Sequence, residues 1–257
     1  MKRVLSLISL FLLASCSSPQ SGGSNKNYAF QIVNNTKAIS ISLKADFNIE
    51  NEDELKIESL PPMQEFTYKA LPAADILDSE DTSYDYGSAS LDNGSKILYY
   101  FKYTFYLKNN SEADTTYNLK FYVKEAKENI SERSLISTIR FMIFENSSND
   151  EHNYGVYAKQ GIEKNIDING NYTYNEFISV RPGNGSRTED AEHPLVTASF
   201  LESGNEGYIR LSNDNFKVNE IMRYTLVVWL EGEDADSIST EAAPIGSSLK
   251  IGAELSR

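Results

Sequence analysis

The sequence predicts an all-β protein, an antiparallel two-sheet β-sandwich of the jelly-roll or Greek-key type. Tyrosine and phenylalanine, which favour strands, are frequent, with 16 and 12 copies in 257 residues. Short runs alternate apolar and polar residues, and turn-forming Gly and Asn separate these runs. Little of the chain has a helical pattern, so strands must bury their apolar faces against a second sheet.

Each expected strand is a short run of apolar residues, and the first run sets the pattern. In the stretch AISISLKADF (38–47), Ile39 and Ile41 alternate with Ser40 and Ser42, which predicts one buried face and one wet face. The other expected strands, in chain order, lie at 65–69, 97–107, 117–123, 135–144, 154–158, 208–211, 222–230 and 248–255.

The segments between these strands carry three further expectations. The turn sequence Asn109-Asn110-Ser111 predicts that 97–107 and 117–123 pair as a hairpin. Helix-forming residues at 124–133 predict one short helix. The acidic, turn-rich stretch 75–94 and the polar stretch 167–192 read as long surface loops.

The first 16 residues have the pattern of an export signal. Lys2 and Arg3 precede an apolar run, 4–13, that is too short to span a bilayer, which needs roughly 20 apolar residues. The following Leu13-Ala14-Ser15-Cys16 resembles the bacterial lipobox. The resemblance implies that Cys16, the only cysteine, receives a diacylglyceryl group and becomes the mature N-terminus. The alternative is an ordinary signal peptide with an incidental cysteine.

These features divide the chain into three parts. We expect a lipoprotein signal peptide at 1–15, a lipidated Ser/Gly-rich flexible tether at 16–27, and a single β-sandwich domain at 28–257. Two or three acyl chains hold a protein stably on a membrane. The expected location is therefore outside the cytoplasm, with the protein anchored by lipid to the cell membrane or the outer membrane.

The charge of the chain limits its partners. The formal net charge is −13, and removal of Lys2 and Arg3 with the signal would make it −15. Such an acidic protein is a poor partner for nucleic acid or for an anionic leaflet. The expected partners are the membrane, through the lipid, and further copies of the protein or other envelope and matrix proteins.

The C-terminal third carries a second resemblance. The stretch MRYTLVVWLEGED (222–234), preceded by a turn at Val218-Asn219, resembles the end of exported Firmicutes proteins that share a "WLEGxD" strand and usually have Pro-Gly at this turn. This group is similar to the TasA and camelysin type of secreted β-sandwich, and the likeness covers roughly 99–255. The resemblance implies a non-enzymatic, TasA-like structural module of a biofilm matrix, or an adhesive one.

Acidic residues after this strand are candidate calcium ligands. Carboxylates at Glu231, Glu233, Asp234 and Asp236 surround a glycine turn, and Ca²⁺ takes six to eight oxygen ligands. The spacing does not match an EF-hand, and a solvated acidic loop is the alternative. A second acidic cluster lies at 78–85, and a calcium site is favoured if both clusters meet at one end of the sandwich. No other cofactor is expected.

The sequence gives little sign of catalysis. His152 and His193 do not form an HExxH motif, and no GxSxG is present. Trp229, among apolar neighbours, is expected in the core, with sugar stacking as the alternative. The leading hypothesis is thus a lipid-anchored, non-enzymatic matrix or adhesive protein. The alternatives are a lipoprotein that binds glycan or peptide, and an envelope hydrolase.

Overall fold

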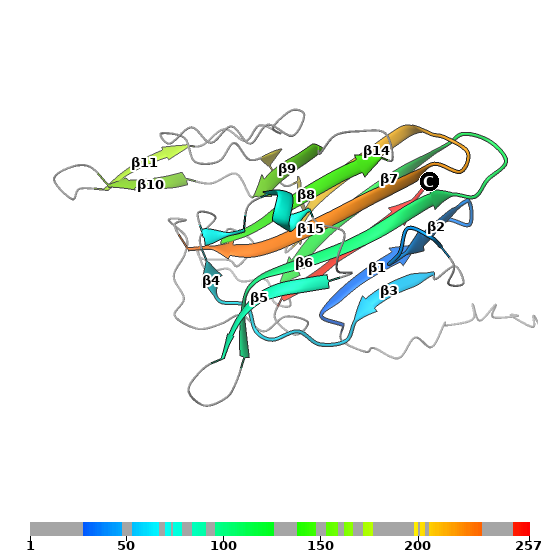
Figure 1. The fold of residues 1–257 in the computed structure, drawn as a ribbon. Coiled ribbons are helices and arrows are strands. Elements are labelled where there is room, and N and C mark those ends of the chain that lie inside the picture. Colours follow the sequence, from blue (N-terminus) through cyan, green and yellow to red (C-terminus); the bar gives the residue numbers. More distant parts are fainter. Residues whose placement is uncertain are drawn as a thin grey trace, which may run out of the picture.

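A computed structural model of the chain shows two β-sheets packed face to face (Figure 1). It describes residues 28–47, 53–66, 70–72, 74–78, 84–90, 96–125, 138–147, 153–158, 162–166, 172–176, 198–199, 201–203, 206–232 and 249–257. Helix is scarce in these ranges, where α1 (Ala74–Leu77) makes a single turn. No helix there is long and apolar enough to cross a membrane. The predicted all-β sandwich is confirmed.

The first sheet has six strands, and most of its pairs are antiparallel. Across the sheet these are β13 (Leu201–Ser203), β14 (Glu206–Phe216), β7 (Thr115–Glu125), β16 (Leu249–Ser256), β1 (Phe30–Asn34) and β3 (Glu54–Ile57). Strand β1 runs parallel to β16, so the start and the end of the described chain lie side by side in this sheet.

The second sheet has eight strands. Its main path is β12 (Ala198–Ser199), β9 (Asn153–Ala158), β8 (Ile139–Ser147), β15 (Ile221–Glu231), β6 (Lys96–Asn109) and β2 (Ile39–Ser42). Two further strands, β4 (Glu65–Phe66) and β5 (Tyr84–Ser90), pair with β15 and β6. A separate hairpin joins β10 (Ile162–Ile166) to β11 (Tyr172–Glu176).

Side chains that alternate along the strands fill the space between the two sheets. In β7 the odd-numbered residues 117–123 are buried, whereas the even-numbered ones point outward. Rings from both sheets meet in this core: the Phe30 and Tyr103 centroids lie 4.5 Å apart, and those of Phe105 and Phe121 lie 6.2 Å apart. Burial of these large apolar side chains is the main favourable term for the sandwich.

The expected strands are present, with shifted boundaries. The run expected to alternate at 38–47 is a strand only over Ile39–Ser42, and all four of its residues are buried. Strands β1 and β3 and the short strands β10–β13 were not predicted. Residues 124 and 125 end strand β7 and do not begin a helix, while 126–133 lie outside the described residues. The two expected loops contain regular structure: α1 and β5 in 75–94, and β11 in 167–192.

The predicted hairpin between 97–107 and 117–123 is wrong. Strand β6 belongs to the eight-stranded sheet and β7 to the six-stranded sheet, so residues 110–114 carry the chain across the sandwich. Strands β14 and β15 make the same crossing through 217–220. Because β6 pairs with β15 and β7 pairs with β14, the two crossings lie next to each other at one end of the molecule. We call them the two arches.

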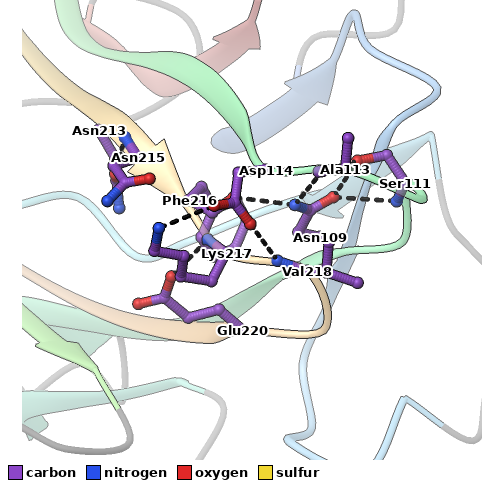
Figure 2. A network of polar contacts seen from close by, with 10 residues as sticks. All are labelled: Asn109, Ser111, Ala113, Asp114, Asn213, Asn215, Phe216, Lys217, Val218 and Glu220. Carbon is purple, nitrogen blue, oxygen red and sulfur yellow. Dashed lines mark hydrogen bonds and ion pairs between the residues drawn. The ribbon is translucent and has the colours of Figure 1, made fainter.

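Hydrogen bonds join the two arches (Figure 2). The Asn109 side-chain amide donates to the carbonyl oxygens of Phe216, at 2.9 Å, and of Ala113, at 3.1 Å. The carboxylate of Asp114 pairs with the Lys217 ammonium at 2.7 Å and accepts the Val218 backbone N–H at 3.2 Å. Each arch therefore satisfies polar groups of the other, which a hairpin turn at 110–114 would leave unpaired.

The second arch contains one residue in the left-handed region. Asn219 has φ 61°, and the Glu220 N–H donates to the Lys217 carbonyl oxygen to close the turn. Asn tolerates this conformation better than most residues. A positive φ at the third position of a turn is what glycine supplies in a Pro-Gly turn, so Val218-Asn219 fulfils the same backbone requirement.

Candidate functional site

The expected lipid attachment point, Cys16, and the signal and tether at 1–27 lie outside the described residues. The described chain begins at Tyr28 and enters the six-stranded sheet at Phe30. Strand β1 then runs toward the arches. There the Asn34 side chain donates to the Ile39 carbonyl oxygen, and Ile39 on β2 pairs with Asn109 on β6. The chain thus enters the sandwich at the end opposite the arches.

Glu231 is the one calcium candidate among the described residues. It ends strand β15, is buried, and accepts a hydrogen bond from the Trp229 indole nitrogen at 2.9 Å. Glu233, Asp234 and Asp236 lie outside the described residues. Within the part of the chain that the structure describes, no three His, Cys, Asp or Glu residues gather as a metal site.

In the second acidic cluster, one carboxylate has an ion-pair partner and a hydrogen-bond donor among the described residues. Asp78 is buried and pairs with the Arg223 guanidinium at 2.9 Å, and it accepts two hydrogen bonds from Asn146 at 2.9 and 3.0 Å. Arg223 is near the start of β15 and Glu231 is at its end, eight residues or roughly 26 Å further on. Asp78 and Glu231 therefore lie toward opposite ends of that strand, while Asp85 of the second cluster is on β5, opposite Lys102 of β6.

Trp229 is fully buried, which confirms the expectation of a core residue. It belongs to a second apolar cluster on the outer face of the eight-stranded sheet, with Met142, Phe144 and Val227. Leu71 and Leu77 from the segment before β5 pack on this cluster, and Phe66 joins it from β4. This sheet is consequently buried on both faces, and β15 is buried continuously over 222–231.

The outer face of the six-stranded sheet is different, because it carries polar and half-buried side chains. We name this surface the tyrosine–lysine face. Four strands form its centre, with Tyr208 and Arg210 on β14, Lys120, Tyr122 and Lys124 on β7, Lys250, Gly252 and Glu254 on β16, and Gln31 on β1. The inward neighbours of these residues are buried in the core.

Tyr122 occupies the middle of the face and leans across β16. A Cβ atom built on Gly252 would lie 2.6 Å from the Tyr122 hydroxyl oxygen and 2.5 Å from the Gln31 carbonyl oxygen. Only glycine leaves room for this ring. Burial, with smaller contributions from Glu254 and Glu206, raises the pKa of the Tyr122 phenol to about 12, so the hydroxyl is neutral and can donate a hydrogen bond.

Cations lie over the other exposed rings of the face. The Lys120 ammonium is 4.7 Å from the centroid of the Tyr208 ring and pairs with Glu206 beyond it. At the far edge, Lys56 is 4.9 Å from the Tyr28 ring centroid and donates to its hydroxyl at 3.3 Å. These contacts hold the charged side chains along the surface of the sheet.

The tyrosine–lysine face is the candidate site among the described residues. His152 and His193 lie outside the described residues. Neither a scan against protein-family models nor a search of curated proteins returns a match to this chain. Sequence reasoning missed the tyrosine–lysine face because its residues come from strands far apart in the chain. The available signal was the alternation of 118–124 and 250–254, whose even-numbered residues are largely polar or aromatic.

Proposed function

We propose that this protein is an exported, lipid-anchored and non-enzymatic module of the cell envelope, which acts in adhesion or as a TasA-like component of a matrix. The observation that carries the proposal is the tyrosine–lysine face, a surface left open on a sandwich whose opposite outer face is covered. The lipobox-like Leu13-Ala14-Ser15-Cys16 supplies the anchor.

The geometry of the sandwich suits a tethered module. Strand β6 has 14 residues and spans roughly 45 Å, which is close to the full length of the sandwich. Since the chain enters at the end opposite the arches, an anchor at Cys16 leaves the arches and much of the tyrosine–lysine face accessible beyond the membrane surface. A broad open face on a rigid sheet is a surface suited to contact with large partners.

The test is fractionation of cells that express the full chain or its Cys16→Ala variant. We expect the unchanged chain in the membrane fraction with incorporated lipid label, and the variant as a released or uncleaved protein. Cells with the anchored protein should retain more matrix than cells with the variant. Equal lipid labelling of the two proteins would reject the anchor, and equal matrix retention would reject the adhesive role.

A lipoprotein that binds glycan is the second candidate, and the tyrosines of the same face favour it. Aromatic rings give large contact areas at low entropic cost, and their faces pack against sugar rings. Light scattering and electron microscopy of the purified protein, with calcium and with chelator, separate the two roles. Filaments or calcium-dependent oligomers support the matrix role, whereas a monomer indifferent to calcium supports the binding role.

A further inference from the structure

The tyrosine–lysine face places like charges directly opposite each other. Arg210 on β14 pairs in register with Lys120 on β7, and Lys124 on β7 pairs in register with Lys250 on β16. Like charges at directly opposed positions destabilise a sheet. Lys124, Arg210 and Lys250 are exposed, so neither basic pair is hidden in the fold. Each basic pair also has a glutamate opposite one of its lysines, Glu206 opposite Lys124 and Glu254 opposite Lys120, so each row has one basic end, at Lys250 and at Arg210.

The charge of this face contrasts with that of the whole protein. Five basic residues lie on it, Lys56, Lys120, Lys124, Arg210 and Lys250, together with three acidic residues, Glu54, Glu206 and Glu254. Their difference is +2, in a chain whose formal net charge is −13. A local excess of positive charge on an acidic protein attracts an anionic partner to that surface and leaves the remainder repulsive.

The two basic pairs flank a row of aromatic residues. Tyr208 and Tyr122 are opposite each other in the pairing of β14 with β7, and Gly252 is next in the same row on β16. The basic pairs lie two residues further along the strands, Lys124 with Lys250 in one direction and Arg210 with Lys120 in the other. The row crosses three strands, which are about 4.8 Å apart, and so spans roughly 10 Å.

From this arrangement we propose that the tyrosine–lysine face binds a carboxylated polysaccharide. Sugar rings lie along the row of Tyr208 and Tyr122, whose ring extends over Gly252 because that residue has no side chain. The carboxylates pair with Lys124 and Lys250 on one side and with Arg210 on the other. The inference rests on the proposed function, since it names the partner through which an envelope module would adhere.

The charge distribution favours this partner over nucleic acid and over a second copy of the chain. Duplex DNA carries one charge per about 1.7 Å, and an acidic protein repels so dense a polyanion at long range. A second copy brings the same net charge of −13. A polysaccharide with one carboxylate for each sugar ring carries fewer charges per unit length than duplex DNA, so this repulsion is weaker, and its rings contact the tyrosines.

The experiment measures binding of the full chain, purified in detergent, to polygalacturonate by titration calorimetry at low salt. Neutral dextran, polyglutamate and duplex DNA are the comparison probes. The variant is Lys124→Gln with Lys250→Gln, and the matched control is Lys37→Gln with Lys44→Gln, which removes two exposed lysines beside β2 in the other sheet. Arg210→Gln tests the second basic pair, and the unfolding midpoint of each variant is recorded.

We expect saturable binding to polygalacturonate that falls roughly tenfold in the double variant and stays unchanged in the control. Binding should weaken with salt, and Tyr208→Ala should reduce it as well. Equal binding by the Lys124/Lys250 variant, or equal binding of dextran, polyglutamate or DNA, would overturn the proposal. Salt-sensitive dimers that the double variant loses, with no polysaccharide bound, would assign the face to a second copy instead.

This outcome is separable from that of the proposed function. Lipid labelling and fractionation of the Cys16→Ala variant do not involve the tyrosine–lysine face. If the unchanged chain is anchored but does not bind polygalacturonate, only the partner is rejected. If it binds polygalacturonate but carries no more lipid label than Cys16→Ala, only the envelope role is rejected.

Discussion

The two outer faces of this sandwich differ in whether other segments of the chain cover them. On the eight-stranded sheet, Phe66, Leu71 and Leu77 cover an apolar outer face around Trp229, so strand β15 is buried without interruption. On the six-stranded sheet, strand β14 alternates buried and accessible residues and leaves Tyr208 and Arg210 at the surface. A continuously buried strand marks a covered face and an alternating strand marks an open one. The open face is therefore the one on which we place the proposed partner.

A substitution in the covered face should lower the free energy of unfolding the most. Trp229→Ala removes the largest fully buried side chain and leaves the buried Glu231 carboxylate without its indole donor. The free energy of unfolding should fall by about 3–5 kcal/mol. Denaturant unfolding followed by circular dichroism measures the change. The matched variant on the open face is Tyr208→Ala, which should cost less than about 1 kcal/mol, and equal losses would contradict the distinction between the faces.

The polar contact that holds the cover in place gives the next effect. Asp78→Ala leaves the buried Arg223 guanidinium without its carboxylate partner. Removal of one partner of a buried ion pair costs about 3 kcal/mol or more. Replacement of both partners, by Asp78→Leu with Arg223→Met, should recover part of this loss because both charges of the buried pair are removed. The same unfolding assay applies, and a loss below about 1 kcal/mol would show that Asp78 does not secure the segment.

The sequence was sufficient to predict the fold class because the pattern that marks a strand is contained within the strand itself. Alternation and aromatic content identified β6, β7, β8 and β15. It was not sufficient for the pairing of these strands. Residues 110–114 have the composition of a hairpin turn, but the Asp114 carboxylate accepts the Val218 N–H, and the Asn109 side-chain amide donates to the Phe216 carbonyl oxygen, about a hundred residues away in the chain. Contacts between residues so far apart in the chain cannot be predicted from the pattern of a short stretch of sequence.

The candidate site shows the same limit at the level of single residues. Trp229 was expected in the core from its apolar neighbours alone, and the structure confirms it. Glu231 was read as a loop carboxylate, yet it is buried against Trp229, because strand β15 extends to it. Tyr122 and Gly252 become neighbours only through the register of β7 with β16. A surface assembled across strands needs the register before its residues can be recognised.

Gly252→Ala tests the open face at a described position where the backbone and the Tyr122 ring leave no room for a side chain. The new methyl group would meet the Gln31 carbonyl oxygen at 2.5 Å and the Tyr122 hydroxyl at 2.6 Å, and the former is backbone that cannot rotate away. We expect a loss of about 1–3 kcal/mol in unfolding free energy. The control is Gly232→Ala, whose nearest contact is 3.4 Å, and it should change stability by less than about 0.5 kcal/mol.

The smallest expected change in stability concerns the arches, where the chain passes from one sheet to the other. The Lys217 ammonium and the Val218 N–H hold the pKa of the Asp114 carboxyl below its ordinary value of 3.8. A carboxyl whose pKa is lower in the folded state stabilises the fold above its unfolded pKa and loses this contribution as pH falls through the folded pKa. Wild type should therefore lose slightly more stability than Asp114→Asn between neutral pH and pH values below 3.8. Unfolding midpoints across that range measure the difference. Because both side chains are exposed to solvent, the difference should shrink with salt. A difference as large as that between Trp229→Ala and Tyr208→Ala would mean that the arches, and not the covered face, hold the sandwich together.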